Sequence, residues 1–158
     1  MKTLLLNSLA AAALAVGGIH SAVGVSGQEP GNQALSLLEV VERLEAAGYA
    51  PLTEISMDDG AWEVETRKEG ESVELTVDLV SGKVLAEHRD DPETAPPKDA
   101  MRLSKLLRIV LENGNYKNLD EVSFERRYWE IEVYKDGQKR ELYVDPMTAN
   151  IVSDRVDD

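Results

Sequence analysis

One stretch of this chain occurs twice, and this internal repeat constrains the fold more than any other feature. The run WEVE at 62–65 returns as WEIE at 129–132, and ELTVD at 74–78 returns as ELYVD at 141–145. A constant offset of 67 residues relates the strand-like parts of the two copies without a gap. Self-similarity of this kind indicates two tandem copies of one small module.

Each copy opens on a predicted amphipathic helix. In the first copy, Ser36 and Glu39 have the spacing of a capping box, and Gly48 provides a left-handed stop. In the second copy, Asp99 is the expected N-cap and Gly114 is the expected stop. The helices are offset by 66 residues, which places one inserted residue just after the second glycine. The apolar stripes at helical spacing are Leu37, Val40, Val41 and Leu44 in the first helix and Leu103, Leu106, Leu107 and Val110 in the second.

After each helix the apolar residues recur at every second position, which indicates strands with one buried face. Two-residue turns at 69–70 and 136–137 fix the pairing of the central strands. In this register Trp62 opposes Val77, and the other apolar residues of the two strands also meet on one face. Trp62 and its counterpart Trp129 are therefore expected in the core.

These patterns predict an α+β protein of two tandem modules, in which each module packs one helix on a three- to four-stranded antiparallel sheet. The first module spans 28–91 and the second spans 100–158. Between them, 92–99 is a proline-rich linker, because proline resists both a helix and a strand ladder. The pattern leaves open whether the two sheets merge into one.

Residues 1–27 are typical of a secretory signal peptide. Lys2 precedes an apolar stretch at 4–16, and no further charge occurs before Glu29. The alternative is an uncleaved anchor, because 3–25 approaches the length of a membrane span, and only in that case is the protein attached to a membrane. The chain has no cysteine, which excludes a lipidated thiol anchor and disulfides. We therefore expect a periplasmic or secreted protein.

Several motifs of the repeat follow one another in a fixed order. After a helix that ends in glycine come D-G-x-W-E-V-E at 59–65, E-L-x-V-D at 74–78 and a Ser-Gly turn at 81–82. This order resembles the PepSY domain family over nearly all of the chain that follows the signal peptide. The second copy departs from it, since Arg126-Arg127 replaces Asp59-Gly60.

The resemblance implies a non-catalytic module of the kind found in peptidase propeptides and in exported or membrane-tethered bacterial proteins. Such modules are often suggested to inhibit or regulate a peptidase. Tandem copies also look like the fold of the β-lactamase-inhibitor protein, which is an analogy of architecture alone.

Composition excludes several classes of function. The chain has 17 basic and 30 acidic residues, a net charge of −13, and no basic block that would bind nucleic acid. Beyond the signal peptide, its single histidine, His88, and its lack of cysteine exclude Cys-His dyads, Ser-His-Asp triads and multi-histidine zinc sites. No spacing selects a carboxylate pair for catalysis. We therefore expect no enzyme, no catalytic residue, no cofactor and no defined metal site.

The candidate binding residues are charged. In the predicted register Glu65 opposes Glu74, and Glu132 opposes Glu141, on the solvent-exposed face of each sheet. One interpretation is a site for a cation or a basic partner. The other is local compensation, as of Glu132 by Lys139 on the diagonal. The candidate partner- or cation-binding residues are Glu65, Glu74, Glu132, Glu141, Arg126 and Arg127.

The two copies also differ in charge. Residues 35–91 carry 15 acidic and 5 basic residues, whereas 101–158 carry 12 and 10. One interpretation is that the copies present different faces to one partner, and a second is that the basic second helix approaches the acidic first copy. The third is drift on solvated surfaces, without a function. If the asymmetry serves a function, association should slow as salt is added.

Three functional hypotheses follow. The first is an exported, non-catalytic binding protein that inhibits or regulates an extracytoplasmic peptidase or sensor protein through an open sheet face or a strand edge. The alternative is a periplasmic ligand or cation sensor that uses the acidic sheet face. The third is a purely structural protein of the cell envelope.

Overall fold

The computed structural model of the chain describes residues 33–92 and 94–157, which we call the first half and the second half. The predicted signal peptide at 1–27 lies outside these residues. Within them, no helix is long and apolar enough to cross a membrane.

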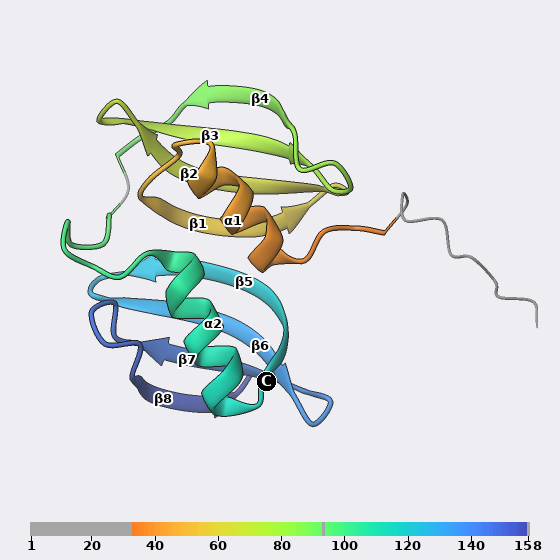
Figure 1. The fold of residues 1–158 in the computed structure, drawn as a ribbon, viewed down its shortest axis with the longest axis vertical. Coiled ribbons are helices and arrows are strands. Elements are labelled where there is room, and N and C mark those ends of the chain that lie inside the picture. The colour runs from red at the N-terminus through yellow and green to blue at the C-terminus, as the bar shows by residue number, and fades with distance from the viewer. Residues whose placement is uncertain (1–32, 93, 158) are drawn as a thin grey trace, which may run out of the picture.

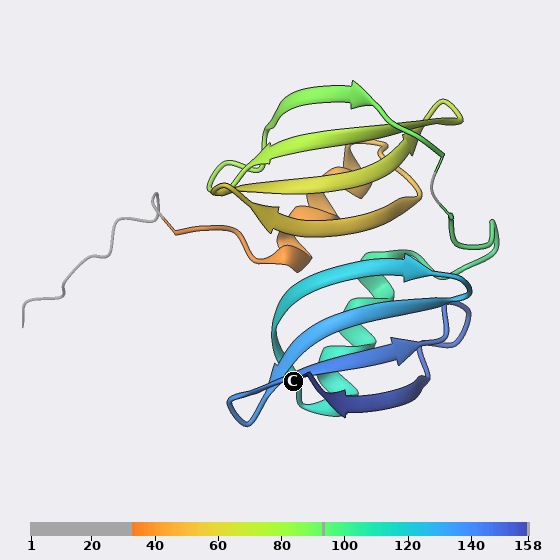
Figure 2. The same ribbon diagram turned by 180° about the vertical axis from the view of Figure 1, so that it is seen from behind.

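One antiparallel sheet of eight strands runs through both halves, in the order β4-β3-β2-β1-β5-β6-β7-β8. Both helices cover the same face of this sheet, and they leave the other face open (Figures 1 and 2). The elements are α1 (Leu37–Ala46), β1 (Leu52–Asp58), β2 (Ala61–Lys68), β3 (Glu71–Asp78), β4 (Val84–Arg89), α2 (Leu103–Gly114), β5 (Lys117–Glu125), β6 (Tyr128–Lys135), β7 (Gln138–Val144) and β8 (Ile151–Val156).

The two halves join at the centre of the sheet, where β1 pairs with β5 through Glu54 with Ser123 and Ile55 with Val122. Ile55 and Val122 are counterparts in the sequence repeat, so a pseudo-two-fold axis passes between them. The predicted α+β class is confirmed. The division into two modules with separate three- to four-stranded sheets is not confirmed, because the backbone ladder continues across the join.

The central hairpins have the predicted register. Trp62 pairs with Val77, and the ladder continues to a two-residue turn. Both turn residues have positive φ, 53° at Glu69 and 89° at Gly70, as a type I′ turn requires. The second half repeats this turn at 136–137 with φ of 52° and 82°. Turn chemistry and apolar alternation therefore agree on one register.

Helix α1 begins and ends as the sequence predicts. The backbone N–H of Glu39 donates to the Ser36 hydroxyl at 3.4 Å, and the Ser36 N–H donates to the Glu39 carboxylate at 2.8 Å, which completes the capping box. Hydrogen bonds from the Ser36 backbone N–H and hydroxyl to the Glu39 carboxylate hold the pKa of Glu39 below its ordinary value. Past the end of the helix, Gly48 has a φ of 93°. The predicted stripe is buried at Leu37, Val40, Val41 and Leu44.

The start of helix α2 corrects the prediction. Asp99 is not its N-cap, because the helix begins at Leu103 after Arg102, whose side chain makes no capping hydrogen bond. The backbone N–H of Met101 donates to the carbonyl of Pro146 at 2.9 Å. This bond to the turn after β7 holds the chain extended until Arg102, so the helix starts only at Leu103.

The end of helix α2 also differs from the prediction. Gly114 is the last helical residue, and the inserted Asn115 takes the left-handed conformation with a φ of 53°. Asparagine tolerates this conformation better than most residues. Gly114 is required by a neighbour instead, since an added Cβ would lie 1.8 Å from the ring of Tyr116. The same glycine in the two copies therefore serves two different purposes.

The core lies between the helices and the sheet. Trp62 and Trp129 are 3% and 1% exposed, which confirms their predicted place in this core. The rings of Trp129 and Phe124 meet edge to face, with their centroids 5.2 Å apart. The corresponding residue of the first half, Met57, is 53% exposed. The second half thus encloses its tryptophan more completely than the first half does.

The first edge strand, β4, is fastened to the segment that follows α1. The Tyr49 hydroxyl donates to the carboxylate of Glu87 at 3.2 Å, and the Lys68 ammonium lies 2.8 Å from the same carboxylate. The ammonium also lies 5.4 Å from the centroid of the Tyr49 ring. The hydrogen bond from Lys68 holds the pKa of Glu87 below its ordinary value. These contacts restrain an edge that has no further strand beside it.

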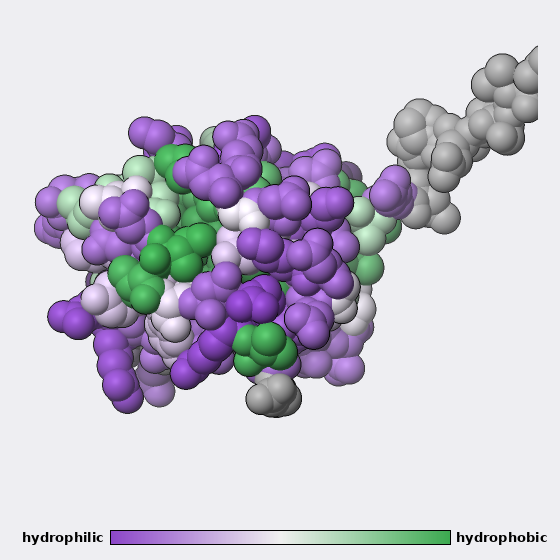
Figure 3. All heavy atoms as spheres, turned by 90° about the horizontal axis from the view of Figure 1, so that it is seen from below, coloured by the Kyte–Doolittle hydropathy of each residue, from purple (hydrophilic) through white to green (hydrophobic). Residues whose placement is uncertain are grey.

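The second edge strand, β8, is fastened in the same way. The Tyr116 hydroxyl donates to Asp154 at 2.7 Å, Arg140 pairs with Asp154 at 2.5 Å, and Lys135 lies 4.8 Å from the centroid of the Tyr116 ring. Burial, together with the hydrogen bond to Asp154, raises the pKa of Tyr116 to about 12. Hydrophilic side chains dominate this end of the molecule and leave only small hydrophobic areas (Figure 3). Charged edges of this kind discourage pairing with further strands.

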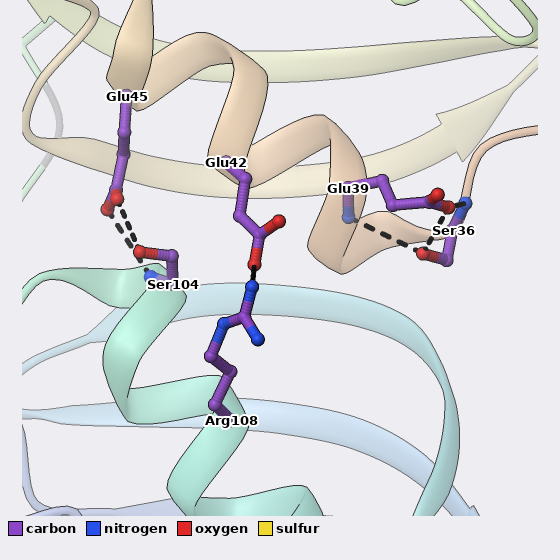
Figure 4. Close-up of polar contacts among 6 residues, drawn as sticks. All are labelled: Ser36, Glu39, Glu42, Glu45, Ser104 and Arg108. Carbon is purple, nitrogen blue, oxygen red and sulfur yellow. Dashed lines mark hydrogen bonds and ion pairs between the residues drawn. The ribbon is translucent and has the colours of Figure 1, made fainter.

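Polar contacts join the two helices across the pseudo-two-fold axis (Figure 4). Arg108 of α2 forms an ion pair with Glu42 of α1. The Glu45 carboxylate accepts hydrogen bonds from the Ser104 hydroxyl at 2.6 Å and from its backbone N–H at 3.3 Å. The basic second helix therefore approaches the acidic first half, as one interpretation of the charge difference predicts.

Candidate functional site

The face of the sheet that the helices leave uncovered is rich in carboxylates. Its side chains come from alternate positions of the strands, whose other positions are buried beneath the helices. Cross-strand pairs link Glu74, Glu65, Glu54, Ser123 and Glu130 in one continuous row. We call this surface, seen in Figure 2, the open face. Its glutamates are Glu54, Glu63, Glu65, Glu74, Glu121, Glu125, Glu130, Glu132 and Glu141.

The two predicted glutamate pairs are both present on the open face. Glu65 opposes Glu74 in the first half, and Glu132 opposes Glu141 in the second. The Lys139 ammonium lies 2.5 Å from the Glu132 carboxylate, which confirms the predicted compensation on the diagonal. Hydrogen bonds to the carboxylates of Glu132 and Asp120 raise the pKa of Lys139 above its ordinary value.

The second pair has a further cation that the sequence reasoning missed. Arg155 of β8 forms an ion pair with Glu141, and its guanidinium donates to the Tyr143 hydroxyl at 3.0 Å. The repeat could have indicated a cation beside Glu141, because Arg155 is the counterpart of His88, which stands beside Glu74 in the first half. In the first half, the exposed His88 stands opposite Glu74 in the same way.

Arg126 and Arg127 lie in the turn between β5 and β6, beside a hollow in the open face. The hollow has a volume of about 880 Å³ and spans the join between the two halves. It is lined by Glu54 of β1, by Glu121, Ser123 and Glu125 of β5, by the two arginines, by Tyr128 and Glu130 of β6, by Tyr143 of β7 and by Val152 and Ser153 of β8.

The carboxylates in and beside the hollow interact with one another. Burial, followed by the charges of Glu132 and Glu54, raises the pKa of Glu121 above its ordinary value. A hydrogen bond to Glu130, burial and a hydrogen bond to Glu141 raise the pKa of Tyr143 to about 12. The site therefore favours an added positive charge, because such a charge relieves the repulsion among its carboxylates.

The structure gathers only some of the predicted residues into one place. Arg126 and Arg127 line the hollow, and the charge of Glu132 helps to raise the pKa of Glu121 in it. Glu65 and Glu74 lie on the other half of the open face. Sequence reasoning missed the remaining lining residues. The signal for them was a difference between the copies, in which Tyr128 and Tyr143 replace Ala61 and Thr76.

The acidic open face does not contain a preformed metal site within the part of the chain that the structure describes. No group of three or more Asp, Glu or His side chains there is arranged to hold a metal ion. Carboxylates spaced along separate strands supply negative charge, but they do not converge on one point as metal ligands do.

Comparison with known proteins places the chain in a wider group. The sequence profile of a family described as peptidase propeptide and YPEB domain matches it twice, over 3–88 and over 85–155. No curated protein matches the chain. Among solved structures, a candidate lipoprotein from Clostridium difficile 630 is 13% identical with a TM-score of 0.46, over 77% of this chain and 99% of that chain. The C-terminal domain of YpeB from Bacillus megaterium is 12% identical with a TM-score of 0.28, over 82% of this chain and 69% of that chain.

Proposed function

The chain belongs to the peptidase propeptide and YPEB domain family, and from this membership we propose that it is an exported, non-catalytic protein that regulates a protein partner. The partner is an extracytoplasmic peptidase or sensor protein, which the chain inhibits or regulates by binding. The observation that carries the proposal is the tandem family match, which extends over both copies of the repeat.

The open face supports the proposal as the surface of contact. Both helices pack on the opposite face, so the open face can meet another protein without displacing a helix. Its side chains project from a continuous ladder of paired strands, which holds them in fixed positions. Its many glutamates suit a partner with a basic surface, and such complementarity speeds association and sets specificity.

Domain organisation and location form part of the same proposal. The segment 28–91 acts as one PepSY-like module and 100–158 as the next, joined by the linker at 92–99. Residues 1–27 direct export, after which the protein works in the periplasm or outside the cell. Because β1 and β5 join the halves into one sheet, the two modules offer the partner a single surface.

Affinity capture tests this proposal. The full chain is immobilised and exposed to envelope extract of its own cells at low and high salt, and the retained proteins are identified. We expect a peptidase or a sensor protein whose activity falls as purified chain is added. Retention should weaken at high salt, because salt screens the attraction between the open face and a basic partner.

Matched variants locate the contact. Exchanging Glu65 and Glu74 together for glutamine preserves the size of both side chains and removes two charges, so retention should fall several-fold. Glu112→Gln changes an exposed residue of α2, on the other side of the molecule, and should leave retention unchanged. If the unaltered chain retains no peptidase or sensor protein, the proposed function is wrong.

A further inference from the structure

One part of the open face is concave, and glutamates, arginines and tyrosines occur there together. The hollow beside the β5–β6 turn is lined by four glutamates, two arginines and two tyrosines, and its volume is about 880 Å³. This space accommodates side chains of a bound segment, whereas a flat row of glutamates offers charge alone.

The negative charge of the hollow is set into its floor. Glu121 and Glu130 stand on β5 and β6, and the pKa of Glu121 is raised by burial and by the carboxylates of Glu132 and Glu54. Glu132 and Glu141 of the open face form ion pairs with Lys139 and Arg155. Among the described residues, these two cations act on Glu121 and Glu130 through their charge without forming an ion pair with them. The floor of the hollow is therefore a favourable place for a cation from another molecule.

The arginines at the rim do not form ion pairs with this floor in the described residues. The Arg127 guanidinium lies 4.8 Å from the centroid of the Tyr128 ring. Over residues 33–92 and 94–157, neither Arg126 nor Arg127 takes part in an ion pair. Their positive charge repels a bound cation from that side of the hollow, so the cation is expected nearer to the glutamates.

The walls add apolar surface next to the charge. Val152 is 54% exposed and lines the hollow together with the rings of Tyr128 and Tyr143. A side chain that matches these walls has an apolar stem and a cationic end, as lysine and arginine do. A bare divalent cation has no stem, and the described residues hold no group arranged to bind one.

We propose that the hollow receives a lysine or arginine side chain, carried by a surface segment of the protein partner. Glu121 and Glu130 bind the cationic end, and Val152 and Tyr143 contact the stem. This inference rests on the proposed function and specifies which residue of the partner enters the open face. The first half lacks an equivalent site, because Ala61 and Thr76 stand where the second half has its two tyrosines.

Two short peptides test the inference directly. The probes are acetyl-Ala-Lys-Ala-amide and the same peptide with norleucine in place of lysine, which keeps the stem and removes the charge. Each is titrated into the isotope-labelled full chain, and backbone amide shifts are followed by NMR. The lysine peptide should shift Glu121, Ser123, Glu130 and Tyr143 in a saturable, salt-sensitive way. The norleucine peptide should bind about tenfold more weakly or worse, as expected when a charged contact is lost.

Variants separate the floor from the rim. Glu121→Gln combined with Glu130→Gln should weaken lysine-peptide binding about tenfold. Asp91→Asn combined with Glu112→Gln removes the same charge at exposed positions away from the open face and should have no effect. Restoring the first-half sequence at the rim, with Arg126→Asp and Arg127→Gly, should tighten binding, because two repelling charges are removed and one attracting charge is added.

Several results would overturn the inference. These are equal binding of the two peptides, an unchanged affinity after the floor glutamates are neutralised, weaker binding after the rim arginines are replaced, and shifts centred on Glu63 and Glu74. Such results leave capture of a partner by the open face untouched. Failure to capture any partner removes the proposed function, while the peptide titration still reports on the hollow.

Discussion

The two halves of the open face share a backbone and differ in what projects from it. Both place glutamate opposite glutamate between their central strands, and both carry their tryptophan in the core. The turn at 59–61 is small and acidic, however, whereas its counterpart at 126–128 brings two arginines and a tyrosine. Identity between the copies marks what the fold needs, and difference marks where one copy has acquired a surface of its own.

Replacement of the tryptophans should have the largest effect on stability. It also tests whether the two halves unfold together in one cooperative transition. Trp62→Ala and Trp129→Ala should each lower the free energy of unfolding by about 3–5 kcal/mol, because a large buried ring leaves a cavity. The loss should be greater for Trp129, which also gives up its contact with Phe124. Denaturant unfolding measures both. The continuous sheet predicts one transition, and two separate transitions would show that the halves unfold independently.

The two glycines at the helix ends test whether equal sequence positions have equal roles. Gly114→Ala should cost about 1–3 kcal/mol, since the new methyl group displaces the ring of Tyr116. Gly48→Ala should cost about 1–2 kcal/mol, because alanine is strained at positive φ. Asparagine separates the two causes in thermal melts. It should be tolerated better than alanine at 48 but no better than alanine at 114, where any Cβ meets the Tyr116 ring. A clear advantage of asparagine over alanine at 114 would contradict the steric explanation.

Two tyrosines of the second half predict a loss of stability at alkaline pH. Tyr116 and Tyr143 have a pKa of about 12 in the folded protein, above the value of about 10 for an unfolded tyrosine. Folding therefore favours the protonated hydroxyl, and this contribution is present below pH 10 and lost as the pH rises toward 12. Tyr143→Phe should flatten the fall in melting temperature over this range. If the slope of melting temperature against pH is unaltered, Tyr143 does not cause the alkaline loss of stability. The first half has Thr76 at the corresponding position, which has no group that ionises in this range.

The smallest expected effect concerns the rim of the hollow. Arg126 has a φ of 56°, a conformation that is strained for arginine and natural for glycine. Arg126→Gly should therefore raise the free energy of unfolding by up to about 1 kcal/mol, which a thermal melt detects. A stabilised variant would show that the second half keeps an arginine here at the expense of stability, as functional positions often do. If Arg126→Gly instead lowers the free energy of unfolding, Arg126 contributes to the stability of the fold.

Local patterns made much of the fold predictable. The register between Trp62 and Val77 followed because a two-residue turn and strict alternation agree on one answer, and a slip of one residue would bury the glutamates. The start of α2 was mispredicted because Asp99 has the chemistry of a cap, while a backbone bond from Met101 to Pro146 decides the matter. That bond joins distant segments and leaves no trace in local sequence.

The merger of the sheets and the hollow depend on the same kind of distant contact. Pairing of β1 with β5 uses backbone groups that every strand has, so the pattern of apolar residues does not predict it. The glutamate pairs could be predicted, because they lie across a single hairpin. The hollow could not, since it takes residues from β1, β5, β6, β7 and β8. Tyr128 and Tyr143 stood out only as places where the copies differ.

A residue beside a two-fold axis meets its own counterpart. Glu42 and Arg108 occupy equivalent positions in the two helices, and they form an ion pair with each other. In a symmetric dimer of identical copies this position would set glutamate against glutamate or arginine against arginine, because isologous contacts are self-matching. Once both copies belong to one chain, each position can change alone. The protein thus has the form of a homodimer whose two halves, joined in one chain, differ both where they touch and on the open face that they share.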